Sequence, residues 1–279
     1  MSLNRDEIIK KCIYAAKQMR FDVVKMTHIA GIQGAHIGGG LSMIEITAVL
    51  YCGVMKLNSE HPEWEERDRF ILSKGHCALA QYAALRQIGI IEEEDLNTFK
   101  QNDTKLSAHL SMNPAIGIEF SSGSLGQGLS LGVGTCLALR RKNNTSSRIF
   151  VLLGDGECNE GQVWEAAISA AHYKLDNLIV IIDKNGMQYD GATSDVLSME
   201  PISDKWAAFG FDVVTVDGHD VEALYDTLTT LPKNGKPVAI VANTIKGKGI
   251  SYMENHPKYH SARLSQEEYE NVLSELGKV

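Results

Sequence analysis

Apolar residues recur at helical spacing in the first part of the chain, whereas short β-rich runs dominate the second part. The spacing predicts a first helix from Asp6 to about Met26, which ends near Ala30 and Gly31. Its apolar positions are Ile9, Cys12, Ile13, Ala16 and Met19. A glycine-rich segment, GAHIGGG, precedes the apolar run LSMIEITAVLYCGVM, which predicts a second, largely buried helix. The loop between these two helices is a candidate ligand site.

The middle of the chain has weaker patterns. A short strand is predicted from Phe70 to Leu72, followed by one helix that begins near His76 and another from Glu92 to Lys100. Residues 102–122 have little periodicity, and we expect them to form surface loops. The next segment contains glycines that permit close packing of a helix running to about Arg141.

Four further β-rich runs are separated by helical patterns. They are IFVLL at 149–153, LIVIID at 178–183, DVVTV at 212–216 and VAIVAN at 238–243. This alternation predicts an α/β fold in which a parallel sheet is flanked by helices on both faces. The segment LSQEEYENVLSELGKV starts with a serine cap and predicts a final amphipathic helix. Because no linker, repeat or low-complexity segment interrupts the pattern, we expect residues 1–279 to form a single domain.

Composition and charge exclude several classes of protein. The chain is 44% hydrophobic and 22% charged, which is typical of a globular protein. A net charge of −8, with acids and bases interspersed, argues against a nucleic-acid partner, and no apolar segment is long enough to predict a membrane span. The five cysteines show no C-x-x-C pair, and the amino terminus shows no secretory signal. We therefore expect reduced thiols in a cytoplasmic protein with no nucleic-acid or membrane partner.

Polar residues that could bind a ligand follow two of the predicted strands. Gly154, Asp155 and Gly156 come directly after IFVLL, and Asn185 comes shortly after LIVIID. Ligands of parallel sheets bind at the carboxyl ends of the strands, so Asp155 and Asn185 can meet if these strands are neighbours. A carboxylate and an amide oxygen suit Mg²⁺, which prefers oxygen ligands and shares those of a diphosphate. Gly-Asp-Gly by itself is as consistent with a tight turn, so the pairing with Asn185 carries the prediction.

The paired motifs match the thiamine-diphosphate motif, and the segment GDGECNEGQVWEAAISAAHYKLDNLIVIIDKNGMQYDG resembles transketolases over essentially its whole length. The segments DRFILSKGHCALAQYAAL, FSSGSLGQGLSLGVG and IKGKGISYMEN are also similar to transketolase signatures, so the resemblance covers nearly the whole chain. It implies the diphosphate-binding domain of the thiamine-diphosphate-binding fold. It also implies transfer of a two-carbon ketol unit from a ketose phosphate to an aldose phosphate, with pentose phosphates as default substrates.

The resemblance also implies roles for individual residues. A divalent metal, Mg²⁺ or else Ca²⁺ or Mn²⁺, would be held by Asp155, Asn185 and the backbone carbonyl of Met187. Four histidines fall where the family places its active-site histidines, namely His36, His76, His109 and His260. We expect His36, His76 and His109 near the substrate, where imidazoles can exchange protons with hydroxyls, and His260 nearer the diphosphate. Contacts with thiamine diphosphate are implied for His76, Gly123, Ser124, Leu125, Gly154, Asp155, Gly156, Glu157, Asn185, Lys246 and His260. A solvated loop lysine is the alternative interpretation of Lys246.

Two loops depart from the family pattern. His36 is followed by Ile37 where transketolases usually have proline, and His260 is followed by Ser261 where they usually have glycine. His256 is a rival for the role of His260. A lone loop histidine is more often a structural or surface residue, but four that match one pattern favour an active site.

In the family, a glutamate from a second, pyrimidine-binding domain assists the removal of a proton from the cofactor, and this chain stops before that domain. The resemblance therefore implies a separate carboxyl-terminal transketolase subunit, assembled with this chain as α2β2. One alternative is that the chain is part of another thiamine-diphosphate enzyme, either a 2-oxo acid dehydrogenase or a deoxyxylulose-phosphate synthase. A non-catalytic, cofactor-binding regulatory subunit is another. An NAD-binding Rossmann protein is disfavoured, because no G-x-G-x-x-G follows the first strand signal.

Overall fold

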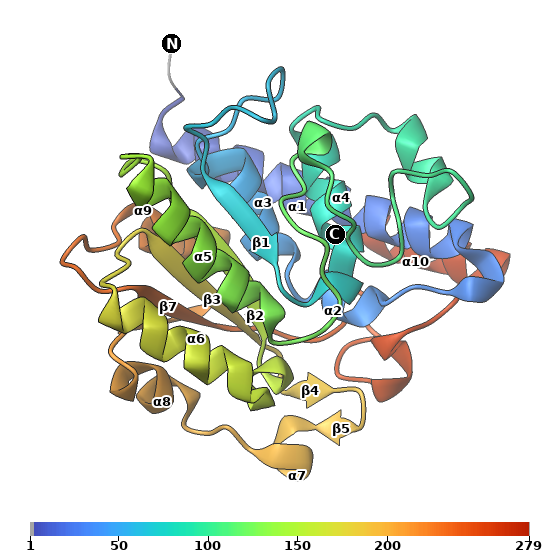
Figure 1. Cartoon of the computed structure of the whole chain (residues 1–279). Helices are drawn as coiled ribbons and strands as arrows, with labels where there is room; N and C mark the ends of the chain where they lie inside the picture. The colour runs from blue at the N-terminus through green and yellow to red at the C-terminus, as the bar shows by residue number, and fades with distance from the viewer. Residues whose placement is uncertain (1–2, 279) are drawn as a thin grey trace.

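A five-stranded parallel sheet organises residues 3–278, the part of the chain that the computed structural model describes (Figure 1). The strands lie in the order β1-β2-β3-β7-β6, and every neighbouring pair is parallel. Their bounds are β1 (Arg69–Leu72), β2 (Ile149–Gly154), β3 (Leu178–Lys184), β7 (Val238–Asn243) and β6 (Asp212–Asp217). The predicted α/β fold and all five predicted strands are confirmed.

Helices cover both faces of this sheet. Neighbouring residues of one strand face opposite layers, so Phe150 packs in one apolar cluster and Val151 in the other. Strands buried on both faces are continuous apolar runs, which is why sequence pattern located them. The first layer contains α1 (Arg5–Ile29), α2 (Ile37–Leu41), α3 (Ile44–Val49), α4 (Ala78–Gln87), α9 (Val221–Thr229) and α10 (Gln266–Lys278). The second layer contains α5 (Gln127–Arg141), α6 (Gly161–His172) and α8 (Ile202–Ala208).

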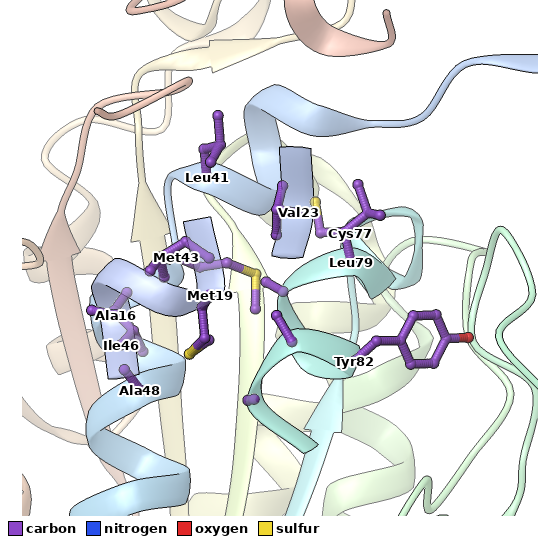
Figure 2. Packing of buried hydrophobic residues seen from close by; sticks show 14 of the residues in the cluster. Ala16, Met19, Val23, Leu41, Met43, Ile46, Ala48, Cys77, Leu79 and Tyr82 are labelled. Carbon is purple, nitrogen blue, oxygen red and sulfur yellow. The ribbon is translucent and has the colours of Figure 1, made fainter. Parts of the chain in front are cut away.

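The first layer forms the larger apolar cluster, part of which Figure 2 shows. The labelled side chains come from α1, from the region of α2 and α3, and from α4 with the turn before it. They are Ala16, Met19, Val23, Leu41, Met43, Ile46, Ala48, Cys77, Leu79 and Tyr82. Because α1 contributes along most of its length, it anchors the glycine-rich loop that follows it. Across residues 3–278, none of the helices combines the length and apolarity needed to cross a membrane.

Capping side chains fix both terminal helices. At the start of α1, Asn4 Oδ1 accepts from the Glu7 amide at 3.0 Å, while Glu7 Oε2 accepts from the Asn4 amide at 2.8 Å. Before α10, Ser265 Oγ accepts from the Glu268 amide at 3.2 Å, and Glu268 Oε2 accepts from the Ser265 amide at 2.8 Å. These reciprocal bonds satisfy amides that a helix leaves unpaired. The first predicted helix and the serine-capped final helix are thus confirmed.

The second predicted helix is divided into pieces. A break at Met43, whose ψ is 12°, separates α2 from α3, and a π-helical turn, Leu50–Val54, ends the segment. The Ser42 hydroxyl donates at 2.5 Å to Asp183 on a distant strand. The second predicted helix, over 41–55, is therefore confirmed from Ile44 to Val54, although its first residue belongs to α2 and its last turn is π-helical.

Two further expectations need correction. The helix predicted over 92–100 is only a 3₁₀ segment, Glu94–Thr98, and the chain leaves helical geometry at the buried Phe99, whose ψ is 124°. Residues 102–122 are largely irregular, as expected, apart from a short 3₁₀ segment at Pro114–Ile116. They are not purely surface loops, since the side chains of Leu106, Leu110, Ile116 and Ile118 are buried.

Helix α5 offers a matched test of its packing on the sheet. A Cβ at Gly132 would lie 2.6 Å from Val151 Cγ2 of β2, whereas a Cβ at Gly134 would have no atom within 4 Å. We expect Gly132→Ala to lower the free energy of unfolding by roughly 1–3 kcal/mol through overpacking. Gly134→Ala should raise it by about 0.5–1 kcal/mol through helix propensity. Urea unfolding of both variants checks this, and equal effects would contradict the close contact of α5 with β2.

Candidate active site

Polar loops converge at the carboxyl edge of the sheet. Strands β2 and β3 are neighbours, with Gly154 opposite Asp183, so Asp155 and Asn185 follow side by side. Strand β7 pairs with β3 on the other side and brings the loop of Lys246 to the same edge. Figure 1 shows a hairpin of β4 (Met187–Gln188) and β5 (Gly191–Ala192), with α7 (Thr193–Leu197), beyond these strand ends. The neighbouring strands that a meeting of Asp155 with Asn185 requires are therefore present.

A cavity of about 390 Å³ lies at this edge. Its lining includes nearly all of the predicted site residues, namely His36, His76, His109, Gly123, Leu125, Gly154, Asp155, Gly156, Glu157, Asn185, Met187, Lys246 and His260. Ser124 is exposed and does not line the cavity. The fold thus gathers residues spread over more than two hundred positions into one hollow.

A buried ion pair lies beneath the cavity. The Lys74 ammonium contacts the fully buried Asp183 carboxylate and also donates to the Gly39 carbonyl at 3.1 Å. Asp183 accepts further hydrogen bonds from Ser42, from Thr244 and from Asn185 Nδ2. Burial alone would raise the pKa of Asp183, but the charge of Lys74 and these donors hold it below its usual value. Asp183 therefore stays ionised and ties four segments together.

The Asp155 carboxylate is surrounded by backbone amides. Oδ1 accepts from Gly156 N at 2.8 Å and Oδ2 accepts from Gly186 N at 2.6 Å. Burial, reinforced by the nearby negative charge of Asp183, raises the pKa of Asp155 to about 6. The Asn185 amide nitrogen is directed at Asp183, and its carbonyl oxygen accepts from Met187 N at 3.1 Å. Carboxylate, amide and carbonyl oxygens thus lie together, and they form the type of donor set that hard divalent cations prefer.

Glu157 joins three loops from within the protein. It is 3% exposed, and its oxygens accept from Gly126 N at 2.8 Å, from Gly154 N at 3.0 Å and from the Ser73 hydroxyl. Burial raises the pKa of this carboxyl group. Although Glu157 borders the cavity, its hydrogen-bonding capacity is directed at protein groups, so its observed role is to hold the loops in place.

Four histidines from four loops form one cluster. The His36 ring centroid lies 5.1 Å from that of His76, 5.5 Å from that of His109 and 5.4 Å from that of His260. Burial and neighbouring cations lower the pKa of His36 and of His76 to about 4, and that of His260 to about 3. The pKa of His109 is lowered mainly by burial. The rings of His36, His76 and His260 are therefore neutral at pH 7 and can each donate and accept hydrogen bonds.

Lys246 extends into this cluster from the loop after β7. Its ammonium donates to His260 Nδ1 at 3.0 Å and to the Met187 carbonyl at 3.3 Å. Because an ammonium has no acceptor, Nδ1 of His260 must accept and Nε2 carries the proton. Burial lowers the pKa of Lys246, which is 4% exposed and not a solvated loop lysine. His256 is directed elsewhere, since its Nδ1 accepts from Lys258 N at 3.3 Å and it does not line the cavity.

Several cavity residues were not predicted from the sequence. They are Gly39, Lys74, Asn159, Glu160, Gln188, Tyr189 and Asp190. The Tyr189 ring lies 5.2 Å from His260, and the buried Asn159 Oδ1 has no hydrogen-bond partner among residues 3–278. Lys74 could have been noticed, because it is a cation in the mostly apolar run FILSKGHCALA. The others lie in loops, where no sequence periodicity predicts which side chains face the cavity.

The neutral state of the cluster can be tested by NMR titration. We expect the imidazole nitrogens of His36, His76 and His260 to show no protonation between pH 8 and pH 5, because their pKa values are about 4 or below. In urea the same residues should titrate near 6.5. The unfolded chain then takes up protons that the folded chain does not, so these groups lower stability as pH falls from 6.5 towards 4. Titration of any of the three above pH 6 in the folded chain would contradict this arrangement.

Comparison with known proteins agrees with this site. A family model described as "Transketolase, thiamine diphosphate binding domain" matches residues 10–278. One of the subunits of apulose-4-phosphate transketolase from Actinobacillus succinogenes is 41% identical over 99% of this chain and 98% of its own length. One of the subunits of 6-deoxy-6-sulfo-D-fructose transketolase from Clostridium sp. is 42% identical over 87% of this chain and 88% of its own. The structure of transketolase from Leishmania mexicana matches with 33% identity and a TM-score of 0.87, over 97% of this chain but 41% of that one. The chain therefore belongs to the transketolase family and carries its thiamine-diphosphate-binding domain.

Proposed function

We propose that this chain is the thiamine-diphosphate-binding subunit of a split transketolase, and that residues 1–279 act as one diphosphate-binding domain. The enzyme transfers a two-carbon ketol unit from a ketose to an aldose. The observation that carries this proposal is the convergence of Asp155, Asn185 and four neutral histidines on one cavity. Near full-length similarity to transketolase subunits of comparable size supports it.

A divalent metal, Mg²⁺ or else Ca²⁺ or Mn²⁺, is proposed at the oxygens of Asp155, Asn185 and Met187. The raised pKa of Asp155 supports this, because burial and Asp183 disfavour its negative charge and a cation would compensate for it. Within residues 3–278 no three His, Cys, Asp or Glu side chains gather as metal ligands, and the proposed set needs only one such side chain. Gly154 and Gly156 beside it let a diphosphate approach the backbone closely.

When bound, thiamine diphosphate supplies the electron sink that allows a carbon–carbon bond to break and re-form. The protein's contribution is to bind, orient and move protons. We assign proton exchange with substrate hydroxyls to His36, His76 and His109, whose neutral rings can act in both directions. Lys246 and His260 are proposed to face the anionic diphosphate side of the site.

The proposed partner is a separate subunit that provides the pyrimidine-binding domain and its glutamate. The chain spans 41% of the transketolase chain from Leishmania mexicana, and two of its relatives are named as transketolase subunits. An α2β2 assembly would place each cofactor between unlike chains. The cytoplasmic location, which we expected partly because the cysteines lack paired spacing, stays a prediction.

Pentose phosphates stay a prediction, and the names of two relatives widen the range of candidate donors. The names of the two relatives specify apulose 4-phosphate and 6-deoxy-6-sulfo-D-fructose, and each sugar carries an anionic phosphate or sulfonate group. We therefore propose a ketose with such an anionic group as the donor. Ile37 and Ser261, which differ from the usual family residues, lie beside His36 and His260 and are candidates for altered specificity.

The metal site predicts a clear effect of Asp155→Ala. Losing the only carboxylate of the proposed ligand set should weaken Mg²⁺-dependent binding of thiamine diphosphate by about 100-fold or more, while the fold is retained. Asp204→Ala, which removes an exposed carboxylate of α8, is the matched control and should bind normally. Calorimetric titration with and without Mg²⁺ measures both, and unchanged affinity in Asp155→Ala would remove Asp155 from the metal site.

If the transketolase is split between two subunits, this chain should be active only in the presence of its partner. With thiamine diphosphate and Mg²⁺, we expect negligible ketol transfer by the purified chain and efficient transfer after co-expression with its partner. Apulose 4-phosphate, 6-deoxy-6-sulfo-D-fructose and xylulose 5-phosphate should be compared as donors by measuring kcat/KM. Full turnover by the purified chain alone would contradict the proposal that a separate subunit is required. Cofactor binding without turnover of any donor would instead favour the regulatory alternative.

A further inference from the structure

A second buried polar network lies on the other side of the Lys246 loop from the active-site cavity. Its centre is Glu45 on α3, which is 6% exposed. Glu45 accepts from the Arg20 guanidinium on α1 and from His219 Nδ1 at 2.9 Å. All three side chains are nearly enclosed, and they border a separate groove of about 530 Å³. They do not line the active-site cavity.

His219 connects this network to the backbone of the loop. Its Nε2 accepts from the amide of Ile245 at 2.8 Å, directly before Lys246. Since Nε2 is an acceptor, the ring proton must be on Nδ1, where it is donated to Glu45. The Glu45 carboxylate therefore determines the tautomer of His219, and this tautomer leaves Nε2 free to accept from the Ile245 amide. A carboxylate behind a metal-bound histidine acts in the same way, because it determines which ring nitrogen faces the metal.

Arg20 holds the far end of the same loop. Its Nε donates to the Lys248 carbonyl at 3.4 Å. Gly249 has a φ of +93°, which side chains rarely adopt, and a Cβ there would lie 2.6 Å from Arg20 Nε, so a substitution would strain the backbone and displace the guanidinium. Between these points, Gly247 N donates to the Gly38 carbonyl at 3.0 Å. The segment 245–249 is thus held at several points along its length.

The turn that carries His219 is itself fixed against the loop. Gly218 N donates to the Asn243 carbonyl at 2.7 Å, and a Cβ at Gly218 would lie 2.4 Å from Thr244 Cγ2. The His219 amide donates to Asp217 Oδ1 at 2.8 Å. Glycine is therefore required for the two loops to approach this closely, and His219 has little freedom to move away from Ile245.

We propose that Arg20, Glu45 and His219 are positioning residues, which act through the 245–249 backbone to set the place of Lys246 in the active site. This inference rests on the proposed function for what Lys246 binds. A buried charged network is costly to desolvate, and well-packed apolar side chains often serve stability equally well. The hydrogen bonds from this network to the loop explain why a charged network is present here. A site loses affinity for its ligand when one of its binding groups is displaced by about 1 Å.

His219→Phe is the main test, because it keeps a ring but removes both hydrogen bonds. In the assembled enzyme we expect faster amide hydrogen exchange in the peptide covering 244–250 and a roughly tenfold rise in the Kd of thiamine diphosphate with Mg²⁺. His219→Gln, which can still donate and accept, should recover part of both effects. Arg20→Lys, which keeps the charge near Glu45 but removes Nε, should accelerate exchange without abolishing folding.

Asp226→Asn is the matched control. It removes the charge of the exposed ion pair between Asp226 and Arg5, which joins α1 to α9 without touching the loop. Exchange in 244–250 and cofactor affinity should therefore stay at wild-type values. The proposal is overturned if His219→Phe leaves both unchanged, or if Asp226→Asn reproduces its effects. Wild-type enzyme that binds no thiamine diphosphate would defeat the proposed function instead, while the exchange measurement would still decide the role of the network.

Discussion

The active site depends on one buried ion pair, Lys74 with Asp183. Neither charge can lose its partner without a large effect, because an unpaired buried charge destabilises the fold by about 3–5 kcal/mol. Asp183 is fully buried at the end of β3 and gathers donors from Ser42, Thr244 and Asn185, which belong to three separate segments. The pair therefore converts separate loops into one rigid base. The cavity above it is shaped by contacts within the protein, which is the preorganisation that binding and catalysis require.

The electrostatic character of the cavity follows from this base. Lys74 is already neutralised by Asp183, so its charge is not free to bind an anion. Asp155 lies close by and receives backbone amides but no comparable ion pair within residues 3–278, which leaves its carboxylate destabilised. Burial, assisted by the nearby cations, also lowers the pKa of His76 and His260 and keeps both rings neutral. Such a site is complementary to a cation, because the charge of a cation would meet the uncompensated carboxylate of Asp155.

The sequence allowed the strands and the main motifs to be predicted, but not the links between distant segments. Strands β2, β3 and β7 are unbroken apolar runs, and strand neighbours align the residues that follow them, so Asp155 and Asn185 could be paired in advance. The break at Met43 has no local pattern in the sequence, and the neighbouring Ser42 bonds to Asp183, which lies far away in the chain. The roles of Lys74, Arg20 and His219 were missed for the same reason, because each depends on a partner far away in the chain.

The two buried networks, around Asp183 and around Glu45, hold different parts of the site in place. Asp183 fixes the ends of the strands from below, whereas Glu45 fixes the loop after β7 from the side, through His219. Both rely on a carboxylate that receives several donors, and both reach the segment 244–249 by different hydrogen bonds. A displacement of this segment would break its bonds to the Asp183 carboxylate and to the His219 ring, so its small movements are opposed from two directions. We infer that the place of the segment 244–249 in the site is determined by residues of this chain.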